Sequence, residues 1–158
     1  MARGEGAVSG AEVLSAIRRT AERQSPRCAV LTCSDSRLSP ELLTLSNIGD
    51  MFVVRVAGNV VTDVVYDSLR FAVESLGVSK IYVIGHKRCG AVALAAQGKA
   101  PSSLAPQLEE ALKRASFDVR RAEVENVCIS CEKLRGLGAE VECYYYDMDK
   151  PALERVCI

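Results

Sequence analysis

Four short apolar runs, separated by stretches with helical spacing, constrain the fold of this chain more than any other feature. The runs are CAVLT (28–32), FVVRVA (52–57), IYVIG (81–85) and VECYYY (141–146). They lack the strict alternation of apolar and polar residues that marks a strand with one face in water. We therefore expect strands that are buried on both faces, as in a parallel sheet covered by helices.

The stretches between these runs predict helices. We expect helices at 10–23, 40–45, 63–76, 107–115 and 120–135, and another that begins in CGAVALAAQ (89–97). For the helix at 63–76, Asp63 is the expected N-cap and Gly77 follows the last turn. Strands that alternate with helices predict the α/β class: a central, mostly parallel β-sheet of four parallel strands, with a possible extra edge strand, flanked by helices.

A chain of 158 residues is long enough for one domain with a substantial core. We expect a single domain over 1–158. Within it, 1–25 form an N-terminal helical arm, 26–147 form the core, and 148–158 form a C-terminal tail.

Charge and hydropathy exclude several classes of partner. The chain has 20 basic and 20 acidic residues, whereas proteins that bind nucleic acids or membrane surfaces usually carry a basic excess. No apolar run approaches the roughly 18 residues of a transmembrane helix. The first residues, MARGEGAVSGAEV, lack the apolar core of a secretory signal. We therefore expect a cytoplasmic protein with no nucleic-acid partner and no membrane partner.

Seven cysteines and one histidine, His86, are the side chains of this chain best suited to metal binding or nucleophilic catalysis. The cysteine count is odd, and a cytoplasmic compartment keeps thiols reduced. We therefore expect core residues, metal ligands or catalytic thiols rather than disulfides. Core packing is the preferred interpretation of the C-x-x-C at Cys128 and Cys131, because both fall on one apolar helical stripe, although a second metal site or a redox pair is the alternative. Cys28 and Cys143 lie inside expected strands and are interpreted as core residues. Cys157 lies in the tail.

Two polar clusters follow two of the expected strands, at the point where each strand ends. Cys33 lies in the first cluster, CSDSR (33–37), and His86 and Cys89 lie in the second, GHKRCG (85–90). The carboxyl ends of parallel strands meet at one edge of a sheet, so the clusters are expected to meet there. Two thiolates and one imidazole form the ligand set of a catalytic zinc with one open position. The sequence therefore predicts a Zn²⁺ site made by Cys33, His86 and Cys89.

Asp35 and Arg37 extend this cluster as C-x-D-x-R. If the backbone stays extended after Cys33, their side chains point to the same side as the thiol. Arg37 can hold the Asp35 carboxylate bidentately, and the held carboxylate can orient a zinc-bound hydroxide. A released Asp35 can instead take the fourth zinc position in a closed form. Each residue alone has a plainer explanation, such as a core thiol or a turn salt bridge. Only their co-location favours a site.

These residues resemble the β-class carbonic anhydrases. The resemblance lies in CSDSR (33–37), FVVRVAGNVV (52–61) and GHKRCGAV (85–92), with weaker similarity in ENVCISCEKLR (125–135) and YYYD (144–147). It covers most of residues 20–147. Two departures stand out, because Val56 replaces an Asn common in the family, and Lys87 and Arg88 replace Thr or Ser and Asp between the ligands. The basic pair either attracts an anion to the entrance or is a solvated turn.

The resemblance implies a fold, a site and an activity. It implies a mainly parallel sheet flanked by helices, a dimer or a multiple of dimers, and an N-terminal helix that packs on the partner subunit. It implies zinc bound by Cys33, His86 and Cys89 beside an Asp35–Arg37 dyad, and we add Gly58 and Asn59 as substrate-binding candidates. The implied reaction is the reversible, zinc-dependent hydration of CO2 to bicarbonate and a proton. Two alternatives stay open: a COS or CS2 hydrolase on the same scaffold, and a non-catalytic structural or regulatory zinc domain.

Overall fold

A five-stranded β-sheet forms the centre of the protein, which is seen in a computed structural model that describes residues 9–157. The strand order is β2-β1-β3-β4-β5. The strands are β1 (Cys28–Thr32), β2 (Met51–Arg55), β3 (Lys80–His86), β4 (Glu140–Asp147) and β5 (Ala152–Arg155). All neighbouring pairs are parallel except β4 and β5, which are antiparallel. The predicted fold class, with four parallel strands and an extra edge strand, is confirmed.

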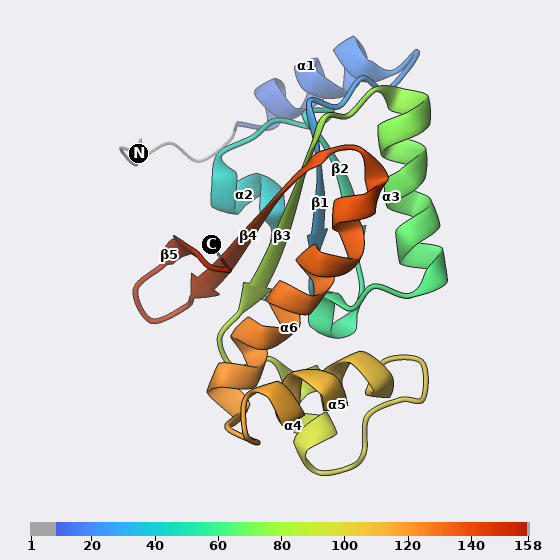
Figure 1. Ribbon diagram of the computed structural model, residues 1–158. Coiled ribbons are helices and arrows are strands. Elements are labelled where there is room, and N and C mark those ends of the chain that lie inside the picture. Colours follow the sequence, from blue (N-terminus) through green and yellow to red (C-terminus); the bar gives the residue numbers. More distant parts are fainter. Residues whose placement is uncertain (1–8, 158) are drawn as a thin grey trace.

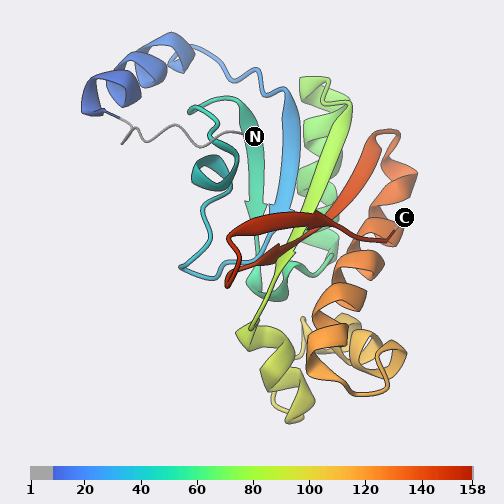
Figure 2. The same cartoon turned by 90° about the vertical axis from the view of Figure 1, so that its left-hand side faces the viewer.

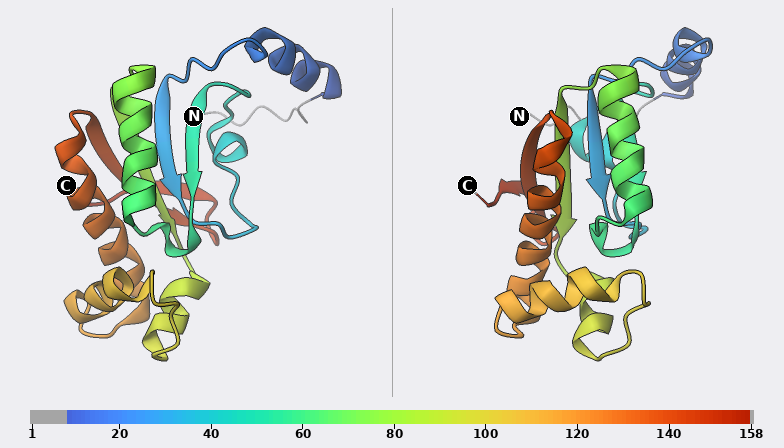
Figure 3. Two further views of the ribbon diagram at one scale, coloured as in Figure 1. Left: turned by 90° about the vertical axis from the view of Figure 1, so that its right-hand side faces the viewer. Right: turned by 45° about the vertical axis from the view of Figure 1, so that its right-hand side comes forward.

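Helices cover the sheet unequally (Figures 1 and 3). The long helices α3 (Asp63–Leu76) and α6 (Val119–Leu134) lie on one face, whereas the short α2 (Pro40–Thr44) lies on the other. Figure 2 looks onto this second face of the sheet, which α3 and α6 leave uncovered. The helices α4 (Gly90–Ala96) and α5 (Ala105–Arg114) gather beyond the carboxyl ends of the strands. The short 3-10 turns η1 (Ala57–Asn59) and η2 (Arg135–Leu137) complete the elements.

Helix α3 spans the predicted residues, but its N-cap is Thr62 and not Asp63. The Thr62 side chain accepts a hydrogen bond from the Val65 backbone N–H, which is the usual role of an N-cap hydroxyl. Asp63 takes the first helical position instead, where a carboxylate favours the positive end of the helix dipole. Gly77 ends the helix with a left-handed φ of 72°, as predicted.

The two ends of the described chain behave differently. The first helix, α1 (Gly10–Thr20), projects from the body of the molecule (Figure 2). Ala16 is buried, but Leu14 and Ile17 are 56% and 44% exposed, so two large apolar side chains of this helix face solvent. At the other end, residues within the predicted tail form β5 and join the sheet. The division into arm, core and tail stays a prediction.

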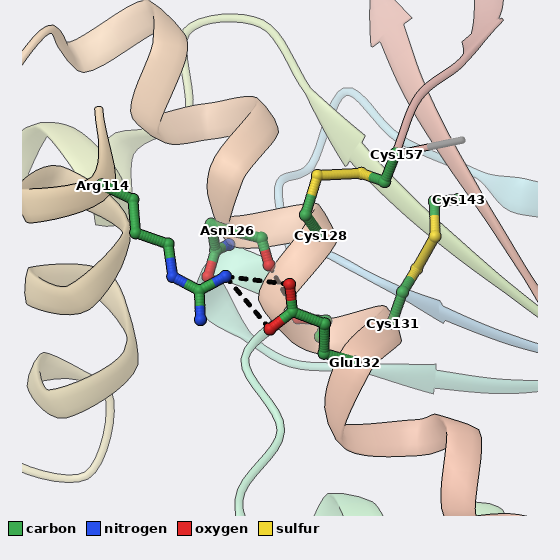
Figure 4. The surroundings of a disulfide bond; sticks show 8 residues. Arg114, Asn126, Cys128, Cys131, Glu132, Cys143 and Cys157 are labelled. Carbon is green, nitrogen blue, oxygen red and sulfur yellow. Dashed lines mark hydrogen bonds and ion pairs between the residues drawn. A yellow bond between two sulfur atoms is a disulfide. The ribbon is translucent and has the colours of Figure 1, made fainter.

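Disulfides join four cysteines, and the prediction that the cysteines stay unpaired is wrong for these four. Cys128 pairs with Cys157, and Cys131 pairs with Cys143 (Figure 4). The first bond ties α6 to the chain just after β5, and the second ties α6 to β4. Cys131 and Cys143 do lie in the core, as expected, whereas Cys28 is only half-buried and lines a surface cavity.

Among residues 9–157, no helix combines the length and the apolar character that a membrane crossing requires.

Candidate metal centre

The register of the sheet places the two polar clusters at one edge. Thr32, the last residue of β1, pairs with Ile84 of β3, so Cys33 and His86 leave the sheet side by side. Cys89 follows one turn later and is the N-cap of α4. One ligand atom each from Cys33, His86 and Cys89 lies within 4.8 Å of the other two. The predicted convergence of these three residues is confirmed, and their role as metal ligands stays a prediction.

The three side chains are buried at 5%, 1% and 3% exposure. His86 Nδ1 lies 3.1 Å from the Lys87 carbonyl oxygen, which can only accept, so Nδ1 carries the proton. Its other ring nitrogen, Nε2, is buried and has no hydrogen-bond partner among the described residues. A buried imidazole nitrogen held in this way is the usual form of a metal-ligating histidine. The donors therefore fit a zinc ion.

The two thiols are electrostatically coupled. A hydrogen bond with Cys89 lowers the pKa of the Cys33 thiol to about 4, while the same contact and burial raise the pKa of the Cys89 thiol. The pair therefore holds one negative charge near neutral pH and keeps one proton. A dication between the sulfurs would favour the loss of that proton, since thiolates are the metal-binding form of cysteine.

Gly58 supports Cys33 from the turn that follows β2. Its backbone N–H donates to Cys33 Sγ at 3.2 Å. Its φ of 70° lies in the left-handed region, and a Cβ there would approach Ala91 and Leu108 to 3.1 and 3.2 Å. Glycine thus permits both the turn and the close approach of the backbone to the sulfur. Gly58 therefore contacts the Cys33 thiol, and the next residue, Asn59, is buried. Binding of substrate by Gly58 and Asn59 stays a prediction.

Asp35 and Arg37 form the predicted bidentate pair beside the ligands. Arg37 Nε and Nη2 donate to the two carboxylate oxygens of Asp35 at 2.8 and 2.7 Å. These hydrogen bonds hold the pKa of the Asp35 carboxyl well below its usual range. Asp35 Oδ2 lies 3.9 Å from His86 Nε2, so the carboxylate faces the same space as the free imidazole nitrogen. The held posture of the dyad is therefore the one observed.

The loop between His86 and Cys89 is anchored by ion pairs, and within it Lys87 is partly buried while Arg88 is exposed. Lys87 Nζ lies 3.1 Å from Asp147 Oδ1, and Arg88 Nη2 lies 2.7 Å from Asp149 Oδ1. Arg37 also donates to the Arg88 carbonyl oxygen at 3.2 Å. Acidic residues at the β4–β5 turn thus balance both cations, which argues against a strongly basic entrance.

Helix α6 contributes polar side chains that the sequence analysis missed. Asn126 Nδ2 donates to the Gly58 carbonyl oxygen, and Ser130 Oγ donates to that of Asn59 at 2.8 Å. Gln107 from α5 donates to both Asn126 and Ser130 at 2.8 Å. One turn earlier, Glu123 accepts from the Cys89 N–H at 2.9 Å. The spacing E-x-x-N-x-x-x-S places these polar side chains on one helix that was expected to pack on the sheet. That pattern could have indicated specific hydrogen bonds, because buried polar side chains need partners.

Comparison with known sequences decides the family. A sequence model described as "Carbonic anhydrase" matches residues 28–138. The chain belongs to the carbonic anhydrase family. The carbonic anhydrase of Mycolicibacterium smegmatis is 38% identical over 110 residues, covering 67% of this chain and 53% of that protein. Carbonic anhydrase 2 of Mycobacterium tuberculosis is 46% identical over 69 residues, or 44% of this chain and 33% of that protein. The chain thus spans about half or less of the length of these relatives.

Solved carbonic anhydrases of the β class share the fold. A tetrameric β-carbonic anhydrase of Sordaria macrospora has a TM-score of 0.80 and 22% identity, over 90% of this chain and 86% of that one. A carbonic anhydrase of Streptococcus mutans has a TM-score of 0.64 and 25% identity, over 91% of this chain and 95% of that one. The fold of the chain is therefore that of β-carbonic anhydrases.

Proposed function

We propose that the chain catalyses the reversible hydration of CO2 to bicarbonate and a proton, with Zn²⁺ held by Cys33, His86 and Cys89. The observation that carries this proposal is the convergence of two thiols and an unpartnered, buried imidazole nitrogen at one edge of the sheet. Zinc at such a site supplies Lewis acidity, which makes water nucleophilic near neutral pH. Membership of the carbonic anhydrase family supports CO2 as the substrate.

The dyad would orient the reacting water. Arg37 keeps the Asp35 carboxylate ionised and fixed, so one of its oxygens can accept a hydrogen bond from that water. Asp35 as a fourth zinc ligand in a closed form stays a prediction, because Arg37 holds it here. The only histidine is assigned to the metal, so the proton must leave through water, buffer or another side chain.

The test is stopped-flow CO2 hydration by protein of measured zinc content, from pH 6.5 to 9, with Cys89→Ser as the comparison. We expect a rate that rises with pH, because the nucleophile forms as water loses a proton. We expect the rate to fall to background in Cys89→Ser together with the zinc content. A zinc-loaded wild type with no rate at any pH contradicts the proposal, and COS and CS2 are then the next substrates to try.

A homodimer, or a multiple of dimers, is part of the same proposal. Leu14 and Ile17 are exposed on α1, and the open face of the sheet carries a cavity lined by apolar residues such as Val30, Met51 and Tyr82. Burial of both surfaces against a second copy would remove them from water. The similar enzyme of Sordaria macrospora is tetrameric. Sedimentation of the wild type and of Leu14→Ser/Ile17→Ser tests this: we expect an oligomer that the double variant weakens, and a monomeric wild type contradicts it.

A cytoplasmic location is also proposed, and the two disulfides weigh against it. Disulfides persist in oxidising compartments and are rare where glutathione keeps thiols reduced. Thiol alkylation in intact cells, followed by mass spectrometry, tests the location: reduced cysteines at all seven positions support the cytoplasm. Quantitative pairing of Cys128 with Cys157 in cells would contradict it.

A further inference from the structure

Glu123 is a buried carboxylate beside the metal centre without a cationic partner. Its exposure is 4%, and no Lys, Arg or His of residues 9–157 lies within ion-pair distance of it. An isolated carboxylate in such a position is strongly unfavourable unless hydrogen bonds compensate it. A chain that needed only packing at this position of α6 would be better served by an apolar side chain. The carboxylate therefore calls for a specific role.

Both carboxylate oxygens are committed to neighbouring elements. Oε1 accepts from the Cys89 backbone N–H at 2.9 Å, and Oε2 accepts from the Tyr145 hydroxyl at 2.6 Å. Tyr145 lies on β4 and is itself buried, so its hydroxyl fixes the carboxylate from the sheet side. Glu123 thus links α6 and β4 to Cys89, which is the N-cap of α4 and carries one of the proposed ligand sulfurs. A hydrogen bond to an ionised acceptor is about twice as strong as a neutral one.

We infer that Glu123 is a positioning residue for the metal centre, with Tyr145 as its support. It holds the Cys89 backbone so that the sulfur faces Cys33 and His86, and its negative charge adds to a site that receives a dication. This inference rests on the proposed zinc function but concerns retention of the metal rather than the chemistry of CO2. Partners behind the ligands commonly govern metal affinity in this way.

The experiment measures zinc dissociation constants by chelator competition in purified wild type, Glu123→Ala, Glu123→Gln and Tyr145→Phe. We expect Glu123→Ala to weaken zinc binding between about 10- and 100-fold, the range found for such partners. We expect Glu123→Gln to recover most of that loss, because its amide oxygen still accepts from Cys89. The cobalt-substituted proteins give a second measurement: the thiolate-to-cobalt absorption bands should shift in Glu123→Ala and return in Glu123→Gln.

The matched control is Leu134→Ala, which truncates a buried apolar side chain of the same helix that packs in the core cluster without Cys33 and Cys89. It should lower the free energy of unfolding without changing zinc affinity or the cobalt bands. A folded Glu123→Ala with wild-type zinc affinity and wild-type bands overturns the inference. If Glu123→Ala does not fold, Tyr145→Phe decides: weaker zinc binding supports the inference, and unchanged affinity and bands overturn it.

Zinc binding and CO2 hydration by the wild type distinguish failure of the proposed function from failure of the role of Glu123. A wild type that binds no zinc removes the proposed zinc function and this inference together. A wild type that binds zinc but does not hydrate CO2 removes the function alone. A zinc-binding, active wild type whose affinity and bands match those of Glu123→Ala removes only the role of Glu123.

Discussion

The two groups of cysteines in this chain lie in contrasting settings. Cys33 and Cys89 lie just beyond the carboxyl ends of β1 and β3, within 4.8 Å of a His86 ring nitrogen, and neither forms a disulfide. The four disulfide-bonded cysteines join α6 to β4 and to the chain just after β5, and the Cα atoms of the two pairs stand 5.5 and 6.4 Å apart. That separation lies within the range that disulfides span. The partner presented by the fold, and not the cysteine itself, decides its chemistry.

The largest contrast is expected from one substitution in each group. Cys33→Ser should abolish zinc binding and bring CO2 hydration to background, because three protein ligands are the minimum of a catalytic zinc site. Cys157→Ser should keep both zinc content and rate, since it removes a bond far along the chain from the ligands. Zinc analysis and stopped-flow rates check both variants. Equal losses in the two would show that the groups are not separate.

Asp35→Asn sharpens the description of the first group. The amide keeps the shape of the side chain but loses the charge that Arg37 holds, so the reacting water loses its oriented acceptor. We expect zinc to stay bound and the hydration rate to fall about a hundredfold, as a misplaced reactant typically costs. The rate of the zinc-loaded variant is the measurement. A wild-type rate would remove Asp35 from the mechanism.

Reduction should separate stability from chemistry. Each disulfide is expected to contribute about 2–4 kcal/mol to the free energy of unfolding. Urea unfolding with and without a dithiol should show the combined contribution of both disulfides in the wild type and that of only one in Cys157→Ser. Alkylation of the unreduced, denatured protein should find three free thiols, which belong to Cys28, Cys33 and Cys89. Seven free thiols would contradict the pairing.

The smallest effect is expected at the turn that connects the two regions. Asp149 pairs with Lys87 and Arg88 between the ligands, but it is half-exposed, and such ion pairs contribute about 0–1 kcal/mol. Asp149→Asn should therefore lower the melting temperature only slightly and leave zinc bound. Calorimetry at low and high salt is the check. Loss of zinc in this variant would show that the ion pairs, rather than the backbone, hold the ligand loop.

The sequence predicted the parts of this molecule that depend on local periodicity and strand order. The strands up to β4, the helix over 63–76 and the meeting of Cys33 with His86 and Cys89 follow from such local patterns. The disulfides did not follow, because 29 and 12 residues separate the partners and only the fold brings them together. Glu123 was missed for the same reason, since its partner Cys89 lies on another element.

The measurement that tests the central claim most directly is X-ray absorption at the zinc edge of the zinc-loaded protein. Our account predicts two sulfur neighbours at about 2.3 Å and nitrogen or oxygen neighbours at about 2.0–2.2 Å, as expected for Cys33, Cys89, His86 and one exchangeable ligand. Four sulfur neighbours at about 2.3 Å would place the metal on Cys128, Cys131, Cys143 and Cys157 and contradict the account.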